Sequence, residues 1–85
     1  MKILEMKIKK LHEDARTPKH ARQGDAGLDI YSIEDFAIEP GEIYTARTGL
    51  SFEILEGYEL QIRSRSGLAS KHGISLVNAP GTLDS

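Results

Sequence analysis

Short runs in which apolar and polar residues alternate recur along this chain, and they limit the folds that it can adopt. An alternation with a period of two residues is typical of a strand with one buried face. The runs are residues 4–9, 28–31, 36–38, 50–54 and 58–63, with a β-rich run at 43–45 and an apolar run at 74–77. The first run would also suit a helix, because Leu4, Ile8 and Leu11 have helical spacing. Short strands at near-regular intervals, with one helical turn, predict an all-β sandwich or barrel.

The length predicts one small domain over residues 1–85. A domain of this size buries roughly 60–65% of its unfolded surface, so its core is small. With no cysteine in the sequence, disulfides do not supplement that core. We therefore expect either oligomerisation or a longer parent protein. Residues 81–85 begin a new strand and then stop, which predicts truncation at the C-terminus.

Charge and hydropathy exclude several classes of protein. The net charge is −2, with 11 basic and 13 acidic residues interspersed, which argues against a general nucleic-acid binder. The three histidines, at positions 12, 20 and 72, lack the spacing of zinc ligands. No apolar run approaches the roughly 18 residues of a membrane span, and Glu5 and Lys7 interrupt any signal peptide. We expect a soluble, cytoplasmic protein.

The stretch from Arg63 to Ile74 is the strongest candidate for a binding site. It reads Arg-Ser-Arg-Ser-Gly-Leu-Ala-Ser-Lys-His-Gly-Ile and follows a predicted strand. A short helical turn is expected at residues 68–71, with Ser66 as its N-cap and His72-Gly73 as its end. Gly67 lets a ligand approach the backbone, and arginine donors match phosphate oxygens. The residues alone leave two readings open, a phosphate-binding loop and a polar loop with solvated charges.

Two other polar segments carry weaker signals. Asp29 stands inside the predicted strand at 28–31, where aspartate is disfavoured. A structural role beside a turn and a catalytic or metal-linked role both remain open for this carboxylate. Lys19, His20 and Arg22 could touch an anion, but solvated loop charges are the expected state.

Three segments together resemble the motifs of the trimeric dUTPase (dUTP diphosphatase) family. Residues 25–32, Asp-Ala-Gly-Leu-Asp-Ile-Tyr-Ser, are similar to the first motif. Arg-Ser-Gly-Leu-Ala at 65–69, followed by Lys-His-Gly-Ile at 71–74, is similar to the second. Asn78, with Gly-Thr-Leu-Asp-Ser at 81–85, is similar to the first half of the third. The order and separations fit as well, and the resemblance implies a jelly-roll-like β-barrel or sandwich.

The resemblance implies hydrolysis of dUTP to dUMP and pyrophosphate by water attacking the α-phosphorus, which lowers dUTP and supplies dUMP for thymidylate synthesis. Mg²⁺ would be carried on the triphosphate oxygens. The implied site residues are Arg65, Ser66 and Gly67 for the phosphates, Asn78, Gly81 and Leu83 for uracil and deoxyribose, Asp84 as the catalytic base for the water, and Asp29 for the metal, through water. The family's homotrimer builds each site from different subunits, with no nucleic acid or membrane as partner.

Departures from the family pattern keep alternatives open. The rest of the third motif and the later motifs would lie beyond Ser85, and Ser64 stands where relatives often carry proline. One alternative is dCTP deaminase, which shares the fold but uses a glutamate further along its chain. The other is a nucleotide-binding fragment without activity. Gly67 and the pattern at 81–85 favour the diphosphatase.

Overall fold

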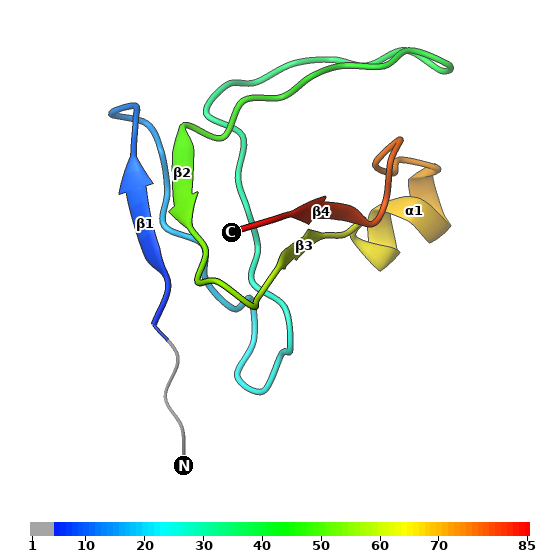
Figure 1. Cartoon of the computed structure of the whole chain (residues 1–85). Helices are drawn as coiled ribbons and strands as arrows, with labels where there is room; N and C mark the ends of the chain where they lie inside the picture. Colours follow the sequence, from blue (N-terminus) through cyan, green and yellow to red (C-terminus); the bar gives the residue numbers. More distant parts are fainter. Residues whose placement is uncertain (1–4) are drawn as a thin grey trace. The chain divides into compact units, whose positions relative to one another are not determined.

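The computed structural model describes residues 5–85. The chain forms two compact units, an N-terminal unit at Lys7–Phe52 and a C-terminal unit that consists mainly of Glu53–Ser85. Figure 1 shows the elements in chain order: four short strands and one helix.

The N-terminal unit is built on a two-stranded sheet. Strand β1 (Lys7–Lys10) pairs with strand β2 (Leu50–Glu53). Along β2, Leu50 and Phe52 are half-buried while the residues between and after them are exposed, as the alternation predicts. The backbone N–H of Leu11 extends the pairing by donating to the Gly49 carbonyl at 2.7 Å. The strand predicted from Leu4 is confirmed from Lys7 onward, and Leu4 itself lies outside the described residues.

Gly49 is required at the tightest point of this unit. Its φ is +68°, a conformation that side chains other than glycine rarely adopt. A Cβ here would lie 3.0 Å from the Cβ of His12 and 3.1 Å from Ala15 and Ile33. Ala15, 6% exposed, is the one buried hydrophobic residue among residues 5–85. The core of this unit is thus small and closes around a glycine.

Three predicted strands of this unit do not form. The run at 28–31 makes an isolated bridge, in which the Asp29 N–H donates to the Lys19 carbonyl at 2.8 Å. The runs at 36–38 and 43–45 lie on the two arms of a long loop, residues 33–47. A hydrogen bond from the Ile33 N–H to the Arg47 carbonyl closes this loop at its base. The Phe36 and Tyr44 rings stack across the arms, with centroids 4.1 Å apart. These strand predictions are wrong because alternation describes one segment, whereas a strand needs a ladder of bonds to a partner.

The C-terminal unit contains two paired strands, with one helix in the connection between them. Strand β3 (Leu60–Ile62) is antiparallel to strand β4 (Gly81–Leu83), with Leu60 opposite Leu83 and Ile62 opposite Gly81. Helix α1 (Ser66–His72) follows β3, and its C-cap is Gly73, whose φ of 64° is left-handed. The predicted helical turn and its end are confirmed. The predicted N-cap is wrong, because extended Arg65 occupies that position without a side-chain cap and Ser66 is already helical.

Many large apolar side chains in the described part of the chain are exposed. Val77 is 76% exposed and Ile43 is 72% exposed. The run at 74–77 leads into a turn and does not form a strand. Within residues 5–85 there is no helix with the length and hydropathy to cross a membrane.

Candidate functional site

The predicted phosphate-binding residues lie where β3 gives way to α1. Arg65 is the extended N-cap, and Ser66 and Gly67 begin the helix. Their backbone N–H groups belong to the first turn of α1, where an N–H has no carbonyl acceptor within the helix. Arg65 is exposed, and its guanidinium makes no hydrogen bond or ion pair with the described residues. The loop therefore presents a cation beside unpaired backbone donors.

Gly67 has no steric reason to be glycine within the chain. Its φ is not left-handed, and a Cβ added to it would meet nothing within 4 Å. Glycine inside a helix costs up to about 1 kcal/mol relative to alanine. The space beside its backbone is open to a ligand.

Arg63 differs from Arg65 in being held by neighbouring side chains. Its Nε and Nη2 donate to Oε1 of Gln61 at 3.2 and 2.6 Å. The Gln61 amide in turn donates to Glu59 Oε1 at 2.9 Å. Gln61 lies in β3 and the other two residues flank the strand at the same two-residue spacing, so the three form one polar row. Arg63 supports this row and leaves Arg65 as the free arginine of the loop.

Asn78 and Gly81 are brought together by the turn before β4. The space where a Gly81 Cβ would stand lies 3.6 Å from Nδ2 of Asn78. Gly81 then opens β4 opposite Ile62, while Leu83 lies opposite Leu60. Two of the residues predicted to contact uracil and deoxyribose are therefore neighbours, and Leu83 lies further along the same strand.

Asp84 lies away from the phosphate-binding loop of its own chain. The antiparallel register places Gly81 beside the end of β3 that leads to Arg65, and Leu83 beside its start. Asp84 follows Leu83, so it lies about 10 Å along the strand from Gly81, at the end away from α1. In Figure 1 the C-terminus likewise points away from the helix. Within one chain, the predicted base and the predicted phosphate loop occupy opposite ends of the ladder.

Asp29 lies in the N-terminal unit on a fixed backbone. Its N–H is bonded to Lys19, its side chain is half-buried, and its carboxylate accepts no hydrogen bond from the described residues. Nearby, His20 Nδ1 lies 2.8 Å from the Gly27 carbonyl oxygen, and Asp25 accepts the Arg22 N–H at 2.9 Å. Residues 5–85 hold no cluster of three or more metal-ligating side chains.

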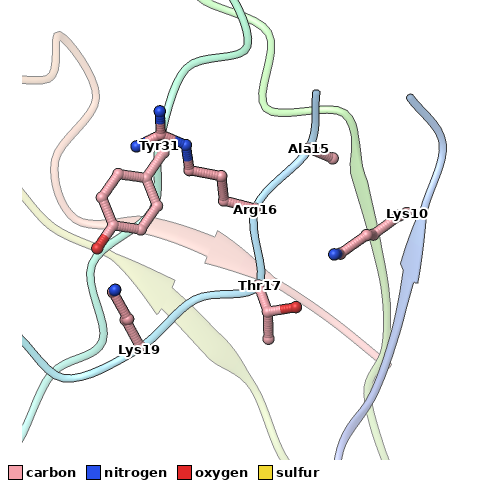
Figure 2. A pocket seen from close by; sticks show the side chains of 6 residues that line it. All are labelled: Lys10, Ala15, Arg16, Thr17, Lys19 and Tyr31. Carbon is pink, nitrogen blue, oxygen red and sulfur yellow. The ribbon is translucent and has the colours of Figure 1, made fainter. Parts of the chain in front are cut away.

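The same unit contains a basic cavity that sequence reasoning missed. It has a volume of about 430 Å³, and Figure 2 shows the side chains that line it: Lys10, Ala15, Arg16, Thr17, Lys19 and Tyr31. The Arg16 guanidinium carbon lies 5.3 Å from the centre of the Tyr31 ring, a cation–π contact. Three cations and no carboxylate line this cavity. Four of these residues lie within 15–19 in the sequence, and the fold adds Lys10 and Tyr31 to them.

Glu34 joins the two arms of the 33–47 loop. The Tyr44 hydroxyl donates to its Oε1 at 2.8 Å, and Arg47 Nη2 donates to its Oε2 at 3.2 Å. Both bonds favour the ionised carboxylate, so Tyr44 first and then Arg47 lower the pKa of Glu34. The same hydrogen bond to Glu34 raises the pKa of Tyr44. These hydrogen bonds hold the two arms of the 33–47 loop together.

The fold matches that of a solved structure. A mutant dUTPase from phage phi11 of S. aureus superposes with a TM-score of 0.81 at 33% identity, over 96% of this chain and 52% of that one. That structure is described as revealing the coordination of a structural Mg(II) ion. The prediction of an all-β fold with one short helix is confirmed. The class is therefore that of all-β proteins with the dUTPase fold.

Sequence comparison narrows the class to a family. The dUTPase family model matches residues 13–85. The deoxyuridine 5′-triphosphate nucleotidohydrolase of Nautilia profundicola is 55% identical over 96% of this chain and 58% of its own length. The enzyme of that name from Trichodesmium erythraeum is 53% identical over 95% and 57%. The chain belongs to the dUTPase family, as the three motifs predict, and it spans a little over half the length of these relatives.

Proposed function

We propose that the protein containing this chain hydrolyses dUTP to dUMP and pyrophosphate with Mg²⁺. The observation that carries the proposal is the loop Arg65–Gly67, where a free guanidinium and unpaired N–H groups flank a glycine with open space beside it. Family membership supplies the substrate, since the relatives named above are deoxyuridine triphosphate nucleotidohydrolases. The family match also spans both compact units, which supports a single dUTPase-type domain over residues 1–85.

The loop binds the phosphate chain in this mechanism. Arg65 offers a fork of donors that matches phosphate oxygens, and Ser66 adds a hydroxyl. The Gly67 N–H donates where a side chain would block the approach. Phosphoryl transfer depends mainly on positioning and on neutralising charge, so this loop needs no covalent nucleophile.

Asn78 recognises the base. Its amide carries a donor and an acceptor, which complement the adjacent N3–H and C4=O groups of uracil. Gly81, beside the Asn78 amide, leaves room for the ring, and Leu83 contributes apolar contact to the deoxyribose. Cytosine presents the opposite pattern at those two positions, so Asn78 would discriminate against dCTP only if its amide is fixed in one orientation.

Asp84 is the general base. A carboxylate within hydrogen-bond distance of the attacking water orients it and accepts its proton. Asp84 is exposed and is not paired with any described residue, so its oxygens are available for that water.

The carboxylates of this chain fit Mg²⁺ held through water. Mg²⁺ prefers oxygen ligands and keeps several waters, so an open carboxylate suits it better than a cage. Asp29 provides such a group, since its backbone is fixed while its carboxylate is unpaired with the described residues. When bound, the ion would neutralise charge on the triphosphate. Asp29 would accept hydrogen bonds from its waters.

We infer that each site combines segments of different subunits in a homotrimer. Asp84 and Arg65–Gly67 lie at opposite ends of the β3–β4 ladder, so one chain by itself separates the base from the phosphates. This separation supports a site at a subunit interface.

Product analysis tests the proposed function. The purified protein is incubated with dUTP and Mg²⁺, and dUMP and pyrophosphate are measured; equal amounts of both are expected. Release of single phosphates, or no dUMP, contradicts the proposal. A parallel reaction with dCTP separates a deaminase, which would release ammonia and leave the triphosphate intact.

A further inference from the structure

Ser64 closes the segment that carries the phosphate-binding residues. Its Oγ accepts the backbone N–H of Leu76 at 2.9 Å, across twelve residues of chain. The side chain is half-buried and lies two residues after the end of β3. Everything from Arg65 to Ser75, α1 included, lies inside the loop that this bond closes.

The other backbone hydrogen bonds of the loop lie at the two ends of α1. At its start, the Ala69 N–H donates to the Arg65 carbonyl at 3.0 Å. The Gly73 N–H donates to the Ala69 carbonyl at 3.2 Å, and the Ile74 N–H donates to the Leu68 carbonyl at 3.1 Å. They shape the ends of α1 but do not join it to β3. Among the described residues, Ser64 provides the side-chain hydrogen bond between the two ends of the loop.

Leu76 extends this connection toward the base-binding turn. While its N–H donates to Ser64, its carbonyl accepts the N–H of Ala79 at 3.4 Å. The turn closed by that second bond contains Asn78. A continuous path of two hydrogen bonds therefore joins the residue before Arg65 to the turn of Asn78.

We propose that Ser64 is a positioning residue that fixes the phosphate loop and the Asn78 turn relative to each other. The inference rests on the proposed dUTP hydrolysis. In a trimer whose sites combine segments of different subunits, the phosphate loop and the Asn78 turn of one chain belong to two different sites. A single hydrogen bond in that chain therefore affects both sites. Loss of the hydroxyl loosens phosphate and base recognition together, although Ser64 touches neither.

The test compares three variants of the full-length protein that contains this chain. Ser64→Ala removes the acceptor, and Ser64→Thr keeps it. Ser75→Ala is the matched control, since Ser75 is exposed in the same loop and its hydroxyl has no partner among the described residues. The measurements are kcat and KM for dUTP, inhibition by pyrophosphate and by deoxyuridine, and amide hydrogen exchange at Leu76.

We expect Ser64→Ala to raise KM and both inhibition constants about fivefold, the factor that one ordinary hydrogen bond is worth. Exchange at Leu76 should accelerate, kcat should change less than KM, and Ser64→Thr and Ser75→Ala should match the parent. Parent-like constants in Ser64→Ala overturn the inference, as does a change confined to pyrophosphate. A parent that makes no dUMP refutes the proposed function itself, and the inference with it.

Discussion

Replacing Gly67 with alanine should make the protein more stable and less active. Gly67 is the second residue of α1, its φ is not left-handed, and a Cβ would meet nothing within 4 Å. Alanine is better than glycine in a helix by about 0.5–1 kcal/mol. For a domain of this size that corresponds to a rise of roughly 2–8 °C in Tm.

The same Cβ should damage substrate binding, because it fills the space through which a phosphate reaches the backbone donor. A hydrogen bond to a charged group contributes about 1.5–3 kcal/mol. Its loss should lower kcat/KM for dUTP by about 10- to 100-fold. Stability and activity therefore move in opposite directions, which a simple folding defect would not produce.

Thermal unfolding and steady-state kinetics with dUTP and Mg²⁺ measure both effects. Ser70→Ala is the matched control, because it improves helix propensity in the same helix at an exposed position. It should raise Tm slightly and leave the kinetics unchanged. Parent-like kinetics in Gly67→Ala would contradict a phosphate contact at the Gly67 backbone, and so would an equal loss of activity in Ser70→Ala.

Three further substitutions, one of them with a matched control, test the catalytic base, the crowded glycine and the carboxylate of the N-terminal unit. Asp84→Asn should lower kcat about 10²–10⁴-fold, the usual contribution of a general base, with little change in KM, and steady-state kinetics would show the split. Gly49→Ala should lower Tm markedly because the site is crowded, whereas Gly41→Ala, also at positive φ but with nothing within 4 Å, should lower it less. Glu34→Gln removes a carboxyl with a lowered pKa, whose contribution to stability is present above its unfolded value near 4.5 and is lost as the pH falls through its folded value. Thermal melts should therefore show parent and Glu34→Gln converging on acidification, and a constant difference would contradict this.

Local features were predictable from the sequence because their causes are local. Alternation located β2 and β3, and a glycine after His72 marked the end of α1. The runs at 28–31, 36–38 and 43–45 alternate equally well, but they lack a hydrogen-bonded ladder in the described structure. Pairing depends on segments distant in sequence, which the pattern of one segment does not encode.

The candidate site likewise has features that the sequence predicts and features that only the fold shows. Arg65–Gly67 are consecutive, so their motif fixes their proximity, and the structure adds the extended Arg65 that displaces Ser66 from the cap. The separation of Asp84 from this loop follows from the β3–β4 register. The Ser64–Leu76 bond follows from loop closure over twelve residues. The resemblance implied a site shared between subunits, but the β3–β4 register and the Ser64–Leu76 bond could not be read from the motifs.

Mixing two inactive variants tests whether this family member hydrolyses dUTP at sites shared between subunits. Arg65→Ala lacks the phosphate contact and Asp84→Asn lacks the base, so each alone should form almost no dUMP. After joint unfolding and reassembly, random symmetric trimers should combine an intact loop with an intact base in about a quarter of their sites. We expect dUMP formation to return to about that fraction of the parent rate. A mixture as inactive as its components, beside an active parent treated identically, would contradict it.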